Sequence, residues 1–250
     1  MTNTWKGFKE FIVFDKVQED ELVTSLYLKL KDDIQLPKPI SGQFIAVRFK
    51  NGDEYTKIRQ YTLSMSNKEN YYRISIKKEE NGEVSKILCD NVNIGDTLEC
   101  TAPVGRFILK DGKEPLVLIG GGIGITPMLA MAYEAVTQNR EIKLIYSLGN
   151  SNHHSFKDEL DKLNKENSDL DLITIYTRPN EEDKLGEDFD LKGRITLEWM
   201  KENLPKNGDY YFCGPVPFMK AIYKNLKAMG IEDDKINYEL FAPGEDITKE

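Results

Sequence analysis

The chain has 250 residues, of which 40% are hydrophobic and 30% charged, and its net charge at pH 7 is −8. This composition is typical of a globular protein, and the length allows one large domain or two of ordinary size. Residues 1–112 carry equal numbers of basic and acidic side chains, so residues 113–250 carry the whole negative excess. Because nucleic-acid binding depends on clustered Lys and Arg, we predict no nucleic-acid partner.

The sequence gives no sign of a membrane span, a secretory signal or a metal site. No apolar run approaches the ~18 residues that a membrane helix needs, and the first ten residues lack an apolar core. We therefore expect a cytoplasmic location. Cys89, Cys100 and Cys213 share no CxxC spacing, so no cysteine-bound metal is predicted. The two histidines, His153 and His154, are adjacent and are predicted to lie in a surface loop.

The first 112 residues read as short strands separated by turns. Alternating or β-branched runs predict short strands, for example at 21–30, 43–49, 58–64 and 71–77, and a helix is expected only at 83–91. Several short strands at this spacing are typical of a small antiparallel barrel of the six-stranded type. We expect this domain to cover residues 1–112.

From residue 113 onward, strands and helices alternate. Apolar runs predict strands at 116–119, 142–147, 172–177 and 210–213, and helices at 127–137, 156–167, 197–202 and 216–229. Strands that are buried on both faces and separated by helices indicate a doubly wound parallel sheet. The sequence thus predicts an α+β two-domain fold, with the barrel followed by a parallel α/β domain at 113–250.

Residues 116–127, LVLIGGGIGITP, run from an apolar strand directly into a glycine cluster. Gly122 and Gly124 allow a ligand to approach the backbone closely, and Thr126 and Pro127 suit the N-cap and the first turn of a helix. A helix N-terminus at this place predicts a pyrophosphate site. Pro127 departs from the usual dinucleotide fingerprint, and a tight strand-to-helix turn without a ligand is the alternative.

Four further motifs come in a fixed order along the chain. They are Arg59-Gln60-Tyr61-Thr62, Gly82-Glu83-Val84-Ser85, Cys213-Gly214-Pro215 and Glu239-Leu240-Phe241-Ala242-Pro243. Taken alone, the first motif reads as an ordinary half-exposed strand. Together with the glycine cluster, the ordered set resembles the ferredoxin–NADP reductase superfamily, and within it the reductase module of flavohemoglobins. The resemblance covers nearly the whole chain.

The resemblance implies an FAD site in the barrel domain. Tyr61 and Phe241 would sandwich the isoalloxazine ring, and Thr62 would hydrogen-bond flavin N5. Arg59 would neutralise the flavin pyrophosphate. The other FAD-contacting residues would be Phe44, Gln60, Ile76, Lys77, Gly82, Val84, Ser85, Ala242 and Pro243.

The resemblance also implies NADH or NADPH as the hydride donor, bound by the second domain. The nucleotide would contact Gly122, Ile123, Gly124, Ile125, Thr126, Pro127, Cys213, Gly214 and Pro215. Cys213 and Glu239 would flank the nicotinamide, so that Thr62, Cys213 and Glu239 are the expected catalytic residues. A buried strand-end thiol without a catalytic role is the alternative for Cys213.

Arg178, which comes after the strand at 172–177, is a candidate ligand for the 2′-phosphate of NADPH. Its alternative role is a surface ion pair with Glu181, Glu182 or Asp183, and these carboxylates would repel a phosphate. Against NADH stands the lack of an acidic residue after 142–147 that could bind the ribose diol. On balance the sequence favours NADH.

The predicted function is that of an FAD-containing, NAD(P)H-dependent reductase. The cysteine pattern cannot supply an iron–sulfur cluster, and we expect no globin segment before the barrel. We therefore expect a separate electron acceptor, either a haem, iron–sulfur or flavin protein or a small molecule. The alternatives are a flavin reductase that releases reduced flavin and a non-catalytic flavin or nucleotide sensor. The C-terminal ELFAPG segment favours a retained flavin.

Overall fold

The computed structural model describes residues 5–32, 35–138, 140–241 and 244–249. It divides the chain into two compact units, Met1–Leu109 and Lys110–Glu250. Within the described residues, every helix is too short or too polar to cross a membrane.

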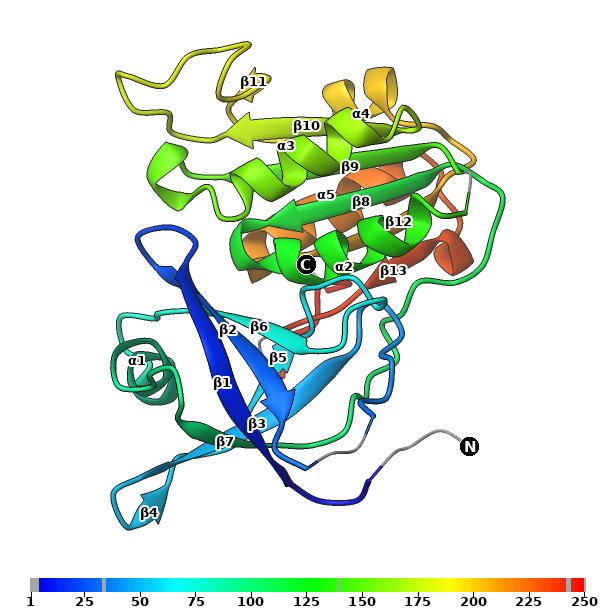
Figure 1. Ribbon diagram of the computed structural model, residues 1–250. Coiled ribbons are helices and arrows are strands. Elements are labelled where there is room, and N and C mark those ends of the chain that lie inside the picture. The colour runs from blue at the N-terminus through cyan, green and yellow to red at the C-terminus, as the bar shows by residue number, and fades with distance from the viewer. Residues whose placement is uncertain (1–4, 33–34, 139, 242–243, 250) are drawn as a thin grey trace. The chain divides into compact units, whose positions relative to one another are not determined.

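The first unit is an antiparallel barrel (Figure 1). Its strands are β1 (Lys9–Gln18), β2 (Val23–Leu30), β3 (Phe44–Asn51), β4 (Glu54–Tyr55), β5 (Arg59–Thr62), β6 (Tyr72–Lys77) and β7 (Thr97–Cys100). Their order is β4-β3-β7-β1-β2-β6, and β5 pairs with β3. The barrel closes between β5 and β6, where Leu63 pairs with Ile74 and the Ser64 amide donates to the Arg73 carbonyl at 3.0 Å. The predicted barrel is confirmed.

Alternate residues of these strands fill the barrel, as period-two patterning requires. Leu26, Leu28 and Ile74 are fully buried in one core cluster, which the helix α1 (Glu83–Asp90) covers with Val84. The C-terminal end of α1 is held by Lys16 of β1, whose Nζ donates to the carbonyls of residues 89 and 92 at 2.7 Å. A cation at this end of a helix also complements the helix dipole.

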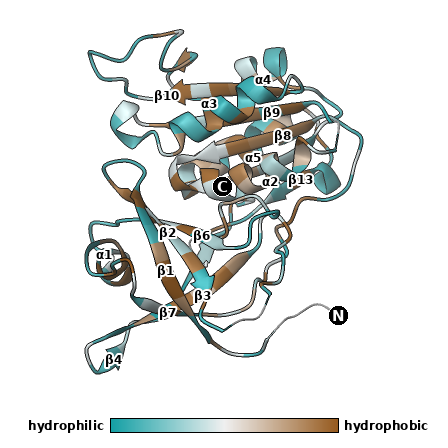
Figure 2. Cartoon of the chain, viewed as in Figure 1, coloured by the Kyte–Doolittle hydropathy of each residue, from teal (hydrophilic) through white to brown (hydrophobic). Residues whose placement is uncertain are grey.

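The second unit is a parallel sheet in the order β11-β10-β9-β8-β12-β13 (Figure 1). The strands are β8 (Leu116–Gly121), β9 (Ile142–Leu148), β10 (Leu170–Tyr176), β11 (Leu191–Lys192), β12 (Asp209–Cys213) and β13 (Ile236–Tyr238). The helices α2 (Ile125–Ala135) and α3 (Lys157–Glu166) cover one face, and α4 (Leu197–Asn203) and α5 (Val216–Ala228) cover the other. The central strands are strongly hydrophobic (Figure 2), and the predicted doubly wound sheet is confirmed.

Two local predictions in the second unit are wrong. Helix α2 begins at Ile125, and Thr126 is inside its first turn, where its hydroxyl donates to the Ile123 carbonyl at 2.9 Å instead of capping the helix. His154 is buried, and its Nδ1 lies 2.8 Å from the Tyr176 hydroxyl. Three short 3-10 turns, η1 (Gly122–Gly124), η2 (Ser151–His153) and η3 (Asp233–Lys235), complete this unit.

A buried arginine fastens the start of the second unit to its sheet. Arg140 donates from Nε and Nη2 to the Glu114 carbonyl at 3.0 and 2.9 Å and from Nη1 to the Lys110 carbonyl at 3.3 Å. Its Nη2 also pairs with Asp209 at 2.8 Å, and Asp209 pairs with Lys235 at 2.9 Å. The segment 110–114 is thereby attached to the amino-terminal ends of β8 and β12.

All three cysteines have buried side chains. Cys89 is on α1, Cys100 ends β7 and Cys213 ends β12. Burial raises the pKa of each thiol. Thiolate is the reactive form of cysteine, so all three are chemically quiet in the folded chain.

Candidate active site

Strand β5, which carries the predicted flavin motif, is paired along one edge only. Its register on β3 places Thr62 opposite Phe44 and Tyr61 opposite Ile45. Along the other edge, the described strands form no ladder beyond the Leu63–Ile74 bridge to β6. The backbone of β5 therefore has a free edge on the side where β6 continues to Ile76 and Lys77 and then to α1. Predicted FAD contacts from distant parts of the sequence are brought together here.

Thr62 and Phe44 belong to one face of the sheet. They are directly paired, and Phe44 in turn exchanges two backbone hydrogen bonds of 2.9 Å with Val104. The ring of Phe44 packs on Gly105, whose backbone has φ +130° and where a Cβ would lie 3.2 Å from the ring. Thr62 is buried, whereas Val104 is 47% exposed. Val104, which the sequence did not single out, is therefore an apolar neighbour of the candidate flavin contacts.

Tyr61 and Arg59 bring the flavin motif close to α1. The Tyr61 ring packs against the barrel core, and burial, followed by the nearby Cys89, raises the pKa of its hydroxyl. Arg59 is exposed and donates to its neighbour's carbonyl at 2.9 Å. The hydrogen bond and charge of Lys57, and then the charge of Arg59, lower the pKa of Glu83. The guanidinium of Arg59 thus acts on the first turn of α1.

The start of α1 is open to an anion. Gly82 is its N-cap and supplies no side-chain hydrogen bond, so the amides of Val84 and Ser85 are not capped. A Cβ at Gly82 would collide with the Ser85 hydroxyl, which accepts a hydrogen bond from residue 79 at 3.2 Å. Lys57, which sequence reasoning missed, pairs with Glu83 at 2.8 Å. Glu83 neutralises Lys57, so the Arg59 guanidinium and the uncapped helix start are the features that fit the pyrophosphate of FAD.

In the glycine cluster, close packing requires some of the glycines, and a different glycine leaves room for a ligand. Added Cβ atoms would meet Ile125 from Gly120 at 2.8 Å, Phe218 from Gly121 at 2.8 Å and the Cys213 carbonyl from Gly124. Gly122 differs, because a Cβ there would meet nothing within 4 Å. Its φ of +51° is a left-handed conformation that favours glycine. Gly122 thus leaves space for a nucleotide against the backbone, next to the uncapped start of α2.

The carboxyl ends of β8, β12 and β13 bring the remaining predicted residues together. Cys213 pairs with Gly120, and Glu239 comes directly after β13, whose last residue pairs with Phe212. Burial raises the pKa of Cys213, and the Glu239 carboxylate raises it further. Burial also raises the pKa of Glu239, to about 7. Since the chain reverses its direction of strand addition between β8 and β12, this edge is where open α/β sheets bind ligands.

Arg178 is exposed in the loop after β10, and its amide donates to the Gly149 carbonyl at 2.9 Å. Among the described residues, no ion pair joins its side chain to the three carboxylates of the same loop. One of these, Asp183, accepts from the amides of Asn180 at 2.8 Å and Ser151 at 3.3 Å. A carboxylate is thereby held against the loop after β9, close to Arg178 in the chain.

The other predicted contacts occupy varied positions. Gln60 and Pro215 are exposed, Ile123 and Gly214 are half-buried, and Ile125, Thr126 and Pro127 are buried in α2. Phe241, two residues beyond Glu239, has a 45% exposed side chain. Ala242 and Pro243 lie outside the described residues.

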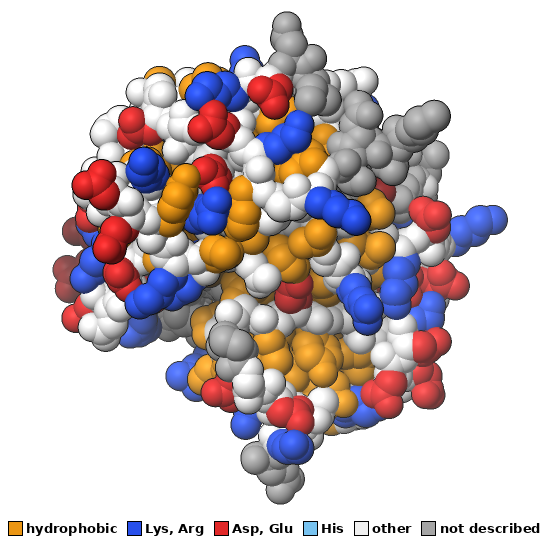
Figure 3. Space-filling model, turned by 90° about the horizontal axis from the view of Figure 1, so that it is seen from below, with side chains coloured by type: hydrophobic (Ala, Val, Ile, Leu, Met, Phe, Trp, Pro, Cys, Tyr) orange, Lys and Arg blue, Asp and Glu red, His pale blue; other side chains and the backbone are white. Residues whose placement is uncertain are grey.

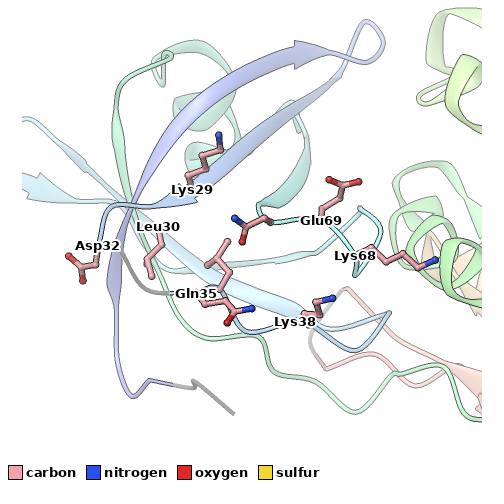
Figure 4. A pocket seen from close by; sticks show the side chains of 9 residues that line it. Lys29, Leu30, Asp32, Gln35, Lys38, Lys68 and Glu69 are labelled. Atoms are coloured by element: carbon pink, nitrogen blue, oxygen red, sulfur yellow. The ribbon is translucent and has the colours of Figure 1, made fainter. Parts of the chain in front are cut away.

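The first unit also has a hollow of about 610 Å³ that contains none of the predicted site residues. Its lining includes Lys29, Lys68, Asp32 and Glu69, and Figure 4 shows the two amino groups pointing in different directions. Charges of both signs without a common centre do not define an ion site.

Hydrophobic side chains also reach the surface among Lys and Arg (Figure 3), and Ile58, beside Arg59, is 50% exposed.

Comparisons with known proteins match a separate oxidoreductase family to each of the two units. The family described as "Oxidoreductase FAD-binding domain" matches residues 11–108, and "Oxidoreductase NAD-binding domain" matches residues 118–224. The flavohemoprotein of Bacillus anthracis is 40% identical over 249 residues, which are 96% of this chain and 62% of the relative. This chain therefore spans less than two thirds of that relative's length.

Solved structures show the same resemblance. The FAD/NAD-binding domain of nitric oxide dioxygenase from Vibrio cholerae is 32% identical, with a TM-score of 0.84 over 94% of this chain and 99% of that one. The flavohemoglobin of Malassezia yamatoensis, solved with FAD and haem, is 29% identical, with a TM-score of 0.83 over 94% and 60%.

A flavin-type barrel followed by a parallel nucleotide sheet defines an oxidoreductase with FAD and NAD as cofactors. The chain belongs to the ferredoxin–NADP reductase superfamily, and it is similar to the reductase module of flavohemoproteins.

Proposed function

We propose that residues 1–112 bind FAD, that residues 113–250 bind the nicotinamide nucleotide, and that the chain passes electrons to a haem, iron–sulfur or flavin protein or to a small acceptor. The observation that carries this proposal is the free edge of β5 beside the uncapped start of α1. Together they leave unpaired backbone groups where a ligand can bind. The open backbone at Gly122 supports the nucleotide role of the second unit.

The residues proposed to bind and orient the cofactors have separate tasks. Bound FAD supplies hydride acceptance and stepwise electron release. Thr62 would hydrogen-bond flavin N5, and Tyr61 would pack against the flavin ring. Arg59 and the amides of α1 hold the pyrophosphate. Glu239 would lie beside the nicotinamide, where its carboxylate would stabilise positive charge on the ring.

The nucleotide preference tests the proposed function directly. Anaerobic addition of NADH should bleach the bound flavin, and NADPH should do so at least tenfold less efficiently, because Asp183 and its neighbours repel a 2′-phosphate. Tenfold corresponds to ~1.4 kcal/mol. Arg178→Ala should preserve that preference. Flavin that neither nucleotide reduces would refute the oxidoreductase role and favour a sensor, whereas NADPH preference lost in Arg178→Ala would identify Arg178 as a phosphate ligand.

Tyr61→Ala should weaken FAD binding by ~1–3 kcal/mol, since it removes buried aromatic area and ring stacking. Titration of the flavin-free protein with FAD gives the change, and Tyr61→Phe is the matched control that keeps the ring. The cofactor released by heating should be FAD, because FMN lacks the pyrophosphate that the start of α1 fits. Wild-type protein that loses its flavin on gel filtration would instead indicate a flavin reductase.

Glu239 should make hydride transfer depend on pH near neutrality. Its pKa of about 7 means that the carboxylate forms as pH rises through that value, so stopped-flow reduction should accelerate there. Glu239→Gln and Cys213→Ala should slow reduction ~100-fold with FAD retained, and Glu239→Gln should flatten the pH profile. Wild-type rates in both variants would remove these residues from the mechanism.

The same shift predicts the pH dependence of stability. The pKa of Glu239 is above its usual value of 4.5, so the folded chain binds this proton more tightly than the unfolded chain. The associated stability is complete below pH 4.5 and is lost as pH rises through about 7.

A further inference from the structure

A buried polar cluster lies directly beyond the flavin motif. Core residues alternate along β2 and β6, so Ser25 on β2 and Arg73 and Ser75 on β6 point to the face away from the barrel core. Ser64, two residues after Thr62, belongs to the same face. Ser25 and Ser64 are 0% exposed and Arg73 and Ser75 are 4% exposed. We call Arg73, Ser64, Ser75 and Ser25 the serine–arginine cluster.

Arg73 and Ser64 are joined by reciprocal hydrogen bonds. The guanidinium donates from Nη2 to the Ser64 carbonyl and from Nε to the Ser64 hydroxyl at 3.3 Å. The Ser64 amide donates to the Arg73 carbonyl at 3.0 Å. The Ser64 hydroxyl also lies 2.8 Å from that of Ser75, which lies 2.8 Å from that of Ser25. The cluster thus holds the backbone and the side chain of Ser64 together.

This hold is needed because β5 has little support of its own. Strand β5 has four residues, and the described strands pair with it along one edge only. On the β6 side, its Thr62 end is therefore fixed by the next two residues of the chain, Leu63 and Ser64. Their contacts with β6 include the Leu63–Ile74 bridge, the hydrogen bonds between Arg73 and Ser64 and the contact of the Ser64 and Ser75 hydroxyls. Burying an arginine costs desolvation free energy. Its directional, charge-assisted hydrogen bonds can restrain the position of a strand end.

We propose that Arg73, acting through Ser64, is a positioning residue that sets where Thr62 meets flavin N5. This inference rests on the proposed function, since it assumes that Thr62 contacts the flavin. Hydride transfer is sensitive to displacements well below 1 Å, so loosening the Thr62 end of β5 should slow reduction while FAD stays bound. The fixed, planar donor geometry of arginine also predicts that lysine, a single point donor, replaces it poorly.

The test measures flavin reduction by saturating NADH, FAD affinity, the visible spectrum of bound FAD and the melting temperature for each variant. Arg73→Met and Ser64→Ala should slow reduction ~10- to 100-fold and alter the spectrum, and Arg73→Lys should recover part of the loss. Ser25→Ala, at the far end of the cluster, should change the rate less than about twofold. Lys16→Met is the matched control, because it removes two hydrogen bonds to α1 in the same unit without touching Ser64.

A double-mutant cycle identifies the route. In a Thr62→Val background, Ser64→Ala should add little further loss of rate, because residues that act through one another are not additive. Additive effects, or equal slowing in Lys16→Met at equal loss of melting temperature, would overturn the proposal. Ser64→Ala removes only a hydroxyl and keeps the test decisive if Arg73→Met fails to fold. Failure of NADH to reduce the wild-type flavin would contradict the proposed function instead.

Discussion

Gly124→Ala is expected to abolish most nucleotide-dependent reduction. The new Cβ would collide with the carbonyl of Cys213 and lie 2.7 Å from the amide of Gly214, and both of these are backbone atoms. Since backbone cannot rotate away, either α2 or the end of β12 must move. Overpacking of this kind costs ~1–3 kcal/mol. Displacement of the nucleotide loop should also lower flavin reduction by NADH ~100-fold while FAD remains bound.

Substitutions at two other glycines distinguish an effect on packing from an effect on ligand binding. Gly122→Ala should cost only ~1 kcal/mol of stability from its positive φ, yet it should weaken NADH binding because its Cβ enters open space beside the backbone. Gly149→Ala, also with nothing within 4 Å, is the neutral control. Urea unfolding and stopped-flow reduction together distinguish the three. Normal reduction by Gly124→Ala would show that the loop tolerates the shift.

Arg140→Ala should produce the largest loss of stability, about 3–5 kcal/mol, because it leaves Asp209 and the Glu114 carbonyl without their buried donor. Lys235 still pairs with Asp209, but it does not reach that carbonyl. Urea unfolding monitored by circular dichroism measures the change. Lys143→Ala is the matched control, since its partner Asp171 is 57% exposed and such pairs contribute ~0–1 kcal/mol. Equal effects of the two substitutions would contradict the structural role of Arg140.

The two-domain fold could be predicted because period-two and apolar-run patterns are local properties of the sequence. The ends of helices and strands were harder to predict where the local conformation depends on packing against other parts of the chain. Helix α2 starts two residues before Pro127 because the loop after β8 must fold tightly against β12, which Gly124 permits. Strands β4, β11 and β13, of two or three residues, carry no pattern of their own and exist only because a neighbour pairs with them.

The site residues that belong to a sequence motif could be predicted, whereas those that only the fold brings close to the site could not. Lys57 and Glu83 are 26 residues apart, and only the placement of α1 beside β5 explains their ion pair. Arg73 looks in sequence like an exposed strand residue, since charged side chains are rarely buried without partners. His154 was misplaced for a related reason, because two tyrosines from different strands enclose a side chain in a polar loop.

The burial of all three thiols has a practical consequence for labelling. Maleimide reagents need an accessible thiolate, so the native chain should react with them only after unfolding. A cysteine introduced at an exposed position such as Glu54 or Glu187 would then be the single target on the folded protein. Fluorophores or spin labels could be attached to either unit in turn without first removing Cys213 from the candidate site.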